Sequence, residues 1–203
     1  MKLYYSPGAC SLAPHIVAQE AGIELTLEKV DFTTRKTASG ADFLAINPKG
    51  YVPALQLDSG EVLTEGPAIV QYLADRKPQS GLAPANGTLE RYRVQEWLGY
   101  INSELHKSYG PLFTPAVSAE SRAERTAYLL KRYALVEAAL AGRSYLAGDQ
   151  FTIADAYLFT VTNWANFVKV DLSSLPNLQA FQKRVAARQG VKAAMAAEGL
   201  PAA

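Results

Sequence analysis

The spacing of hydrophobic residues changes near residue 75, and this change constrains the fold more than any other feature of the chain. Before it, runs of alternating apolar and polar residues are interleaved with runs of helical periodicity. After it, every segment has helical periodicity and none is a good strand candidate. With 203 residues, 49% of them hydrophobic, the chain is long enough to bury two small cores. The sequence therefore predicts an α+β domain followed by an all-α domain.

The first 75 residues are expected to form a mixed sheet with helices packed on it. Strand, helix and strand come first, over residues 2–6, 11–22 and 24–32, with Leu25, Leu27 and Val30 turned inward. A short helix over 41–47, a hairpin over 54–64 and a helix over 66–75 follow. The βαβ unit implies parallel strands, and the hairpin adds antiparallel ones.

Residues 76–88 have the composition of a linker, with Pro or Gly at positions 78, 81, 84 and 87. Helices are expected beyond it over 89–109, 120–141, 153–167 and 177–198. In the third of these, Thr152 and Asp155 have the spacing of a capping box. Its apolar residues lie on nearly all faces, which predicts a central position. The Ala-rich end of the chain is expected to be helical and then to fray.

Cys10 is the only cysteine, and it lies between Pro7-Gly8 and the start of the first helix. Free N–H groups at a helix N-terminus favour an anion, so the sulfur could be a nucleophilic or redox-active thiolate. The alternative is an inert, buried thiol. Ala13 occupies the place of the second cysteine in a C-x-x-C motif, so redox chemistry here would need an external thiol such as glutathione.

Two further features of the first domain suit ligand binding. Pro53 leads into a strand after Val52; its peptide bond is either trans at an edge or cis, which would turn the Val52 backbone toward a ligand. Glu65 and Gly66 precede Pro67 at another helix N-terminus, which either holds an anionic group or is a plain cap.

The helix expected over 89–109 has a core face and a polar face. The polar face carries Gly99, Ser103 and His106. This face is either the floor of a cleft or a surface exposed to solvent. His15 could tune the thiol, but a structural role is favoured. The core face carries Val94, Trp97, Leu98, Ile101 and Leu105.

Composition excludes several classes of function. A net charge of +1 without a basic run argues against nucleic acid or an anionic membrane as partner. No apolar run is long enough for a signal peptide or a transmembrane helix. A single cysteine cannot form an internal disulfide, which favours a reducing compartment and predicts a cytoplasmic protein.

Taken together, six stretches in order along the chain closely resemble the cytosolic glutathione S-transferases, in particular the bacterial beta class. They are "YYSPGACSLAPH", "KTASGADFLAINPKGYVPAL", "LTEGPAIVQYLAD", "ERYRVQEWL", "SELHKSYGPLF" and "FTIADAYLF". The resemblance implies a thioredoxin-like domain with a mixed four-stranded sheet over 1–77, a linker over 78–88 and an all-helical domain over 89–203. It also implies a homodimer and no metal.

The resemblance also implies roles for individual residues. Cys10 and His106 would be catalytic, with Cys10 beside the glutathione sulfur and able to form a mixed disulfide with it. Ser11 and His106 are candidate donors to a thiolate. The residues expected to bind glutathione are Tyr5, Ser11, Arg35, Val52, Pro53, Glu65, Gly66, Ser103, Glu104 and His106. Ser103 or Glu104 would reach across the dimer interface. A pocket for a small hydrophobic electrophile would be lined by Tyr109, Leu112, Phe113 and Trp164.

Three positions depart from the family pattern: Gly66 replaces the usual Ser, Arg35 the usual Lys, and Gly99 a frequent Asn. The first change removes a hydroxyl that would bind a carboxylate, and the second changes the geometry of a cation. Three functions remain open at this stage: a transferase, which could include dehalogenation, a glutaredoxin-like reductase, and a non-catalytic carrier of hydrophobic ligands.

Overall fold

The computed structural model describes residues 1–201, and they divide into two compact units. The first unit comprises Met1–Ala83 together with the segment that begins at Ala186, and the second is Pro84–Val185. The division differs at one end from the expected domains, because the last segment of the chain groups with the first unit. Hydrophobic periodicity shows that a helix has an apolar face, but it does not show which unit that face packs against.

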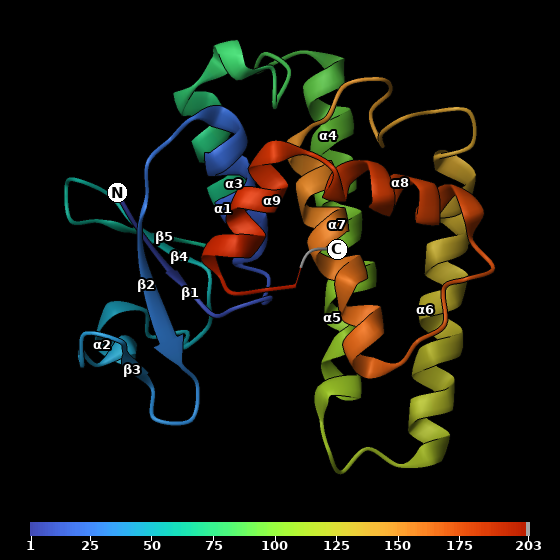
Figure 1. Cartoon of the computed structure of the whole chain (residues 1–203), viewed down its shortest axis with the longest axis horizontal. Helices are drawn as coiled ribbons and strands as arrows, with labels where there is room; N and C mark the ends of the chain where they lie inside the picture. The colour runs from blue at the N-terminus through green and yellow to red at the C-terminus, as the bar shows by residue number, and fades with distance from the viewer. Residues whose placement is uncertain (202–203) are drawn as a thin grey trace. The chain divides into compact units, whose positions relative to one another are not determined.

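The first unit is built on a mixed sheet with the order β3-β2-β1-β4-β5 (Figure 1). β1 (Lys2–Tyr5) pairs in parallel with β2 (Thr26–Asp31) and antiparallel with β4 (Ala54–Gln56), which pairs with β5 (Val62–Thr64). The turn between β4 and β5 is closed by the N–H of Gly60 on the carbonyl of Leu57 at 2.9 Å, so the predicted hairpin is confirmed.

The expectation of four strands was wrong, because the sheet has five. β3 (Lys36–Thr37) pairs antiparallel with Val30 and Asp31 at the edge of the sheet. Two residues are too few for an alternating pattern, so the strand gives no periodic signal in the sequence.

Three helices of this unit lie together on one face of the sheet (Figure 1). α1 (Leu12–Ala21) packs against both α3 (Gly66–Arg76) and α9 (Gln189–Ala197). α1 ends at Gly22 in the left-handed region, with φ of 64°, which fits the predicted stop. A 3₁₀ turn, Pro78–Ser80, follows α3.

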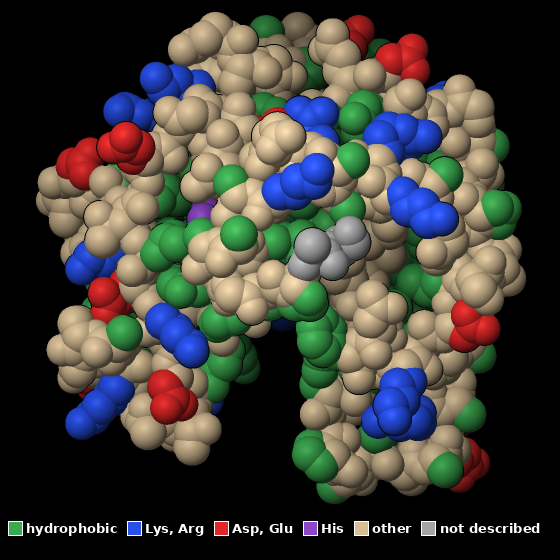
Figure 2. Space-filling model, in the orientation of Figure 1, with side chains coloured by type: hydrophobic (Ala, Val, Ile, Leu, Met, Phe, Trp, Pro, Cys, Tyr) green, Lys and Arg blue, Asp and Glu red, His purple; other side chains and the backbone are tan. Residues whose placement is uncertain are grey.

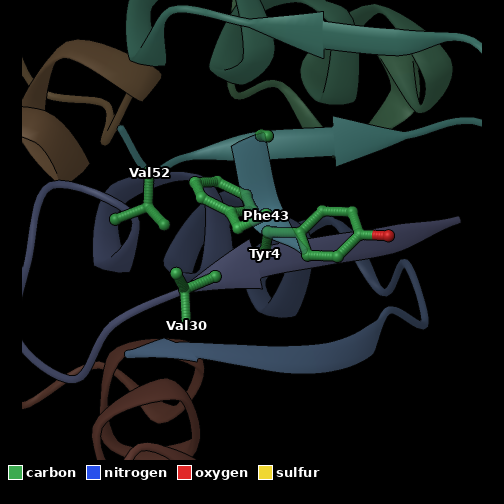
Figure 3. Packing of buried hydrophobic residues seen from close by; sticks show 5 residues of the cluster. Tyr4, Val30, Phe43 and Val52 are labelled. Atoms are coloured by element: carbon green, nitrogen blue, oxygen red, sulfur yellow. The ribbon is translucent and has the colours of Figure 1, made fainter. Parts of the chain in front are cut away.

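A second layer of the core lies beneath the short helix α2 (Phe43–Ile46). Tyr4, Val30, Phe43, Val52 and Ala54 are buried together there, and Figure 3 shows the first four converging from separate elements. The rings of Tyr4 and Phe43 lie 5.7 Å apart. Since successive strand residues face opposite sides, the neighbouring Leu3 is buried on the other face. This core holds Val52, the residue before Pro53, in a fixed position.

The second unit is helical. A long first segment comprises α4 (Leu89–Tyr100), a π-helical turn η2 (Ile101–His106), α5 (Lys107–Tyr109) and a 3₁₀ turn η3 (Gly110–Phe113). α6 (Ala119–Ala139), α7 (Ile153–Val168) and α8 (Pro176–Ala186) follow. Nearly all of α7 is buried and its start carries the Thr152/Asp155 capping box, as predicted.

Two helix predictions for the second half of the chain need correction. The expected continuous helix over 89–109 contains the π-helical turn, in which the N–H of Lys107 bonds to the carbonyl of Asn102, five residues earlier. The expected helix over 177–198 is two helices, α8 and α9, separated at Ala187 and Arg188. Both helices are amphipathic, but α8 belongs almost entirely to the second unit and α9 to the first.

Among residues 1–201, no helix is both long and apolar enough to cross a membrane. Figure 2 shows acidic and basic side chains scattered over the face in view. This distribution agrees with the near-zero net charge of the chain.

Candidate functional site

Cys10 lies in the loop that connects β1 to α1, two residues before the helix begins. Its side chain is partly exposed, and Sγ donates a hydrogen bond to the carbonyl oxygen of Val52 at 3.1 Å. The Val52–Pro53 peptide bond is cis, one of the two alternatives considered for it from the sequence. The sulfur is therefore held beside a backbone segment and not enclosed in hydrocarbon.

The loop over residues 6–11, here called the thiol loop, is fixed by its own hydrogen bonds. The N–H of Ser6 donates to Oγ of Ser11, which in turn donates to the carbonyl of Ser6, both at 3.2 Å. Ser11 is fully buried, so its hydroxyl supports the loop. Tyr5 precedes the loop, and burial, followed by the charge of Glu198, raises the pKa of its hydroxyl.

Glu198, which follows α9, holds the thiol loop from the C-terminal end of the chain. Its Oε2 accepts the N–H of Gly8 at 2.9 Å, and its Oε1 lies 2.9 Å from Nδ1 of His15. His15 and Glu198 are both buried, so the structural interpretation of His15 is supported. No sequence pattern singles out Glu198, because its partners lie at the opposite end of the chain.

Glu65 occupies the position before α3 with φ of 70°, a left-handed conformation that is uncommon outside glycine. Its carbonyl accepts the N–H groups of Ala68 and Ile69, both at 3.0 Å, and its carboxylate contacts Nζ of Lys49 at 2.7 Å. Lys49 was not predicted as a site residue. Gly66 begins the helix, and a Cβ built on it would lie 3.9 Å from Cγ of Pro53.

Arg35 lies on the turn between β2 and β3, with φ of 57°. Its guanidinium donates to the carbonyl of Gly50 at 2.8 Å and lies over the ring of Phe32. These contacts tie the arginine to the segment that leads into Val52. Arg35 and Cys10, two of the predicted residues of the first unit, are thus both bonded to the backbone of residues 50–52.

In the second unit, His106 ends the π-helical turn and faces α7. Its Nδ1 lies 2.5 Å from the hydroxyl of Tyr157, which donates to Oδ1 of Asn102 at 3.0 Å. The edge of its ring also packs on Trp164, with the centroids 4.8 Å apart. The sequence pattern had grouped His106 with Gly99 and Ser103. Asn102 and His106 are four residues apart, so they lie on one side of the helix, and both contact the hydroxyl of Tyr157.

Ser103 and Glu104 both have partners within the second unit. The hydroxyl of Ser103 donates to the carbonyl of Gly99 at 3.0 Å. The carboxylate of Glu104 pairs with Nε of Arg132 at 2.8 Å and accepts the hydroxyl of Tyr128 at 2.7 Å. Binding of glutathione, or a contact across a dimer, by either residue stays a prediction.

Three of the four residues expected to line the acceptor pocket, Tyr109, Phe113 and Trp164, form an aromatic cluster. The rings of Tyr109 and Phe113 lie 5.7 and 5.6 Å from that of Trp164. Phe113 is 49% exposed, whereas Tyr109, Leu112 and Trp164 are buried. Burial, reinforced by the neighbouring Tyr133 hydroxyl, raises the pKa of Tyr109 above its usual range. Phe113 is therefore the member of the cluster most accessible to a ligand.

No group of three or more His, Cys, Asp or Glu side chains able to hold a metal ion occurs within the described range 1–201. The chemically capable groups described above are the Cys10 thiol, the N-termini of α1 and α3, the imidazole of His106 and the aromatic cluster around Trp164.

Family models match both halves of the chain. Residues 8–76 match the N-terminal domain of glutathione S-transferases, and residues 97–189 match their C-terminal domain. The chain belongs to the glutathione S-transferase family.

Individual relatives agree with this assignment over the full length. The chain is 48% identical to the glutathione S-transferase GstA of Escherichia coli O157:H7, over 98% of this chain and all of that one. It resembles a sphingomonad glutathione S-transferase solved with glutathione, and the beta-class enzyme of Sphingomonas chungbukensis. Each has 49% identity and a TM-score of 0.95, covering 99% of this chain and all of the other. These relatives place this glutathione transferase with the bacterial beta class.

Proposed function

We propose that this glutathione transferase binds glutathione beside Cys10 and joins its thiol to small hydrophobic electrophiles. The observation that carries the proposal is the placement of the only sulfhydryl group of the chain. Sγ of Cys10 lies two residues before α1 and 3.1 Å from the carbonyl of Val52, in the unit that matches the family's N-terminal domain. The complex of a relative with glutathione supports the same ligand here.

In this proposal the backbone of Val52, next to Pro53, pairs with the cysteinyl part of glutathione. Glu65 and Gly66, at the N-terminus of α3, hold the γ-glutamyl end, where N–H groups favour a carboxylate and a side-chain carboxylate favours an amine. Arg35, tied to the carbonyl of Gly50, supplies the positive charge for the glycyl carboxylate.

Activation of the bound thiol requires more than a helix end. Lowering a thiol pKa by two units corresponds to about 2.7 kcal/mol of thiolate stabilisation. The dipole of a helix terminus contributes roughly 0.3–1 kcal/mol. Because Ser11 is already used by the thiol loop, we assign the remaining contribution to backbone N–H groups and to His106. The aromatic cluster around Trp164 supplies the apolar surface for the electrophile, with Phe113 as its accessible member.

A second activity, glutathione-dependent thiol–disulfide exchange, is favoured by the partial exposure of Cys10. A Cys10 thiolate would attack the glutathione sulfur of a mixed disulfide between glutathione and a substrate thiol, breaking its S–S bond, forming a Cys10–glutathione disulfide and releasing the substrate as a thiolate. A glutathione thiolate would then attack the glutathione sulfur of the Cys10–glutathione disulfide, restoring the Cys10 thiolate and forming oxidised glutathione. We further propose that the enzyme acts in the cytoplasm as a homodimer.

The deciding experiment is intact mass spectrometry of the protein after incubation with oxidised glutathione. One added glutathionyl group, located at Cys10 by peptide mapping and removed by reduced glutathione, is the expected result. The Cys10→Ser variant is the matched control and should remain unmodified. An unmodified wild-type protein that also fails to bind reduced glutathione in calorimetry would overturn the proposal.

A further inference from the structure

We infer that Asn102 and Tyr157 hold the neutral side chain of His106 in the tautomer protonated at Nδ1, which leaves Nε2 as the ring's proton acceptor. Tyr157 and Asn102 are then positioning residues for this histidine. The use of Nε2 in catalysis rests on the proposed function, whereas the tautomer itself does not.

The direction of the hydrogen bonds follows from the number of protons available. A tyrosine hydroxyl has one proton, and Tyr157 donates it to Oδ1 of Asn102 at 3.0 Å. The same hydroxyl lies 2.5 Å from Nδ1 of His106, so at that contact its oxygen must accept. Nδ1 therefore carries a hydrogen. A neutral imidazole has only one N–H, which places the lone pair on Nε2.

The surroundings keep these three side chains in this arrangement. Tyr157 is 1% exposed on the buried helix α7, so its hydroxyl has little freedom to turn elsewhere. The π-helical turn presents both Asn102 and His106, four residues apart, to that one hydroxyl. Trp164 packs against the imidazole edge-to-face, with an interplanar angle of 78°. The orientation of the ring is thus set by packing as well as by hydrogen bonding.

This tautomer changes the role of His106 from that of a simple donor. Before reaction, Nε2 can accept the thiol proton of glutathione: the S–H bond breaks, an N–H bond forms, and the electron pair stays on sulfur. The product is an imidazolium with protons on both nitrogens. The oxygen of Tyr157 continues to accept from Nδ1–H, and the new Nε2–H can donate to the thiolate. Tyr157 and Asn102 therefore stabilise the histidine both before and after proton transfer.

Nuclear magnetic resonance tests the tautomer directly. The chain contains two histidines, so in protein labelled with ¹⁵N-histidine the two-bond proton–nitrogen spectrum contains two rings, assigned with a His106→Gln variant. The spectrum is recorded without glutathione, at a pH where the ring is neutral. His106 should show a protonated Nδ1 and an unprotonated Nε2. The opposite pattern in the wild-type protein would overturn the inference.

Four variants separate the tautomer from a general structural effect. Tyr157→Phe removes the acceptor, and Asn102→Leu frees the tyrosine proton to point at Nδ1, so both should give a ring protonated at Nε2. Asn102→Asp retains an oxygen acceptor and should keep the wild-type pattern. Tyr100→Phe is the matched control, because that hydroxyl donates to the carbonyl of Arg132. An unchanged pattern in both Tyr157→Phe and Asn102→Leu would contradict the assignment.

Kinetics then tests the link to catalysis. In Asn102→Leu and Tyr157→Phe, kcat for conjugation should fall about tenfold while KM for glutathione changes little. Asn102→Asp should retain most of kcat. If the tautomer changes as expected but kcat does not, the catalytic role proposed for His106 is wrong and the tautomer assignment stands.

Discussion

Nδ1 of His15 donates a hydrogen bond to the carboxylate of Glu198 at 2.9 Å, although 183 residues separate them in the chain. The same carboxylate accepts the N–H of Gly8 in the thiol loop. One buried side chain near the C-terminus thus supports both the first helix and the loop that carries Cys10. The close packing of α1 and α9 brings these residues together.

Replacing Glu198 by Ala should lower the free energy of unfolding by about 3 kcal/mol, because a buried histidine and a loop N–H lose their common acceptor. Urea denaturation measures this change. The ion pair between the Met1 amino group and Asp58, whose side chain is 82% exposed, provides the control. Asp58→Ala should change stability little. Equal destabilisation by the two substitutions would contradict this account.

Replacing Cys10 by Ala should separate the two proposed activities. Disulfide reduction should be lost, because the mixed disulfide can no longer form. Conjugation should persist in part, because the backbone of Val52 and the N-terminus of α3 remain to bind glutathione. Steady-state assays with a disulfide and with an aryl halide measure the two rates. Loss of both activities to the same degree would mean that Cys10 serves one common step.

Replacing Gly66 by Ser should strengthen glutathione binding about fivefold, which corresponds to one additional hydrogen bond of about 1 kcal/mol. The site has room, because a Cβ at residue 66 meets Cγ of Pro53 at 3.9 Å, an ordinary contact. Isothermal titration calorimetry measures the dissociation constant. Gly66→Ala is the matched variant, since it adds the Cβ without the hydroxyl. If the Gly66→Ser variant binds glutathione no more tightly than the Gly66→Ala variant does, a hydroxyl at residue 66 has no role in binding.

The capping box of α7 should make stability depend on pH. Burial raises the pKa of the Asp155 carboxyl from 3.8 to about 6, although the N–H groups of Leu146 and Thr152 act in the opposite direction. Between about pH 4 and 6 the folded protein therefore holds this proton more tightly than the unfolded chain, so the contribution of Asp155 to stability increases as pH falls.

Asp155→Asn removes this titration. Relative to that variant, the wild-type protein should gain about 2 kcal/mol of unfolding free energy between pH 7 and pH 4, since each pKa unit corresponds to about 1.4 kcal/mol and the shift is not fully expressed until the pH lies below both pKa values. Urea titrations at several pH values measure the difference. Asp171 is the control, because the N–H of Ser173 lowers the pKa of its carboxyl group. The free energy of unfolding of the wild-type protein relative to Asp171→Asn should therefore decrease as pH falls. A difference that does not vary with pH would contradict the prediction.

Features encoded by a few neighbouring residues were predictable from the sequence. The strand–helix alternation, the hairpin around residues 58–60 and the Thr152/Asp155 capping box all depend on local spacing, and all are present in the structure. The position of Cys10 before the first helix is local in the same sense. Hydrophobic periodicity and turn chemistry act over a few residues, which is why a single sequence reports them.

Other features were decided only by the tertiary structure. Strand β3 exists because a neighbouring strand offers it hydrogen bonds, and Glu198 reaches the thiol loop because α9 packs on α1. The partnership of His106 with Asn102 and Tyr157 depends on a π-helical turn meeting α7. The contacts of Glu198 and Tyr157 require residues far apart in the chain to satisfy one another's hydrogen bonds, and β3 requires the adjoining strand β2. Such pairing leaves no periodic trace in the sequence, because it is specified by packing and not by local propensity.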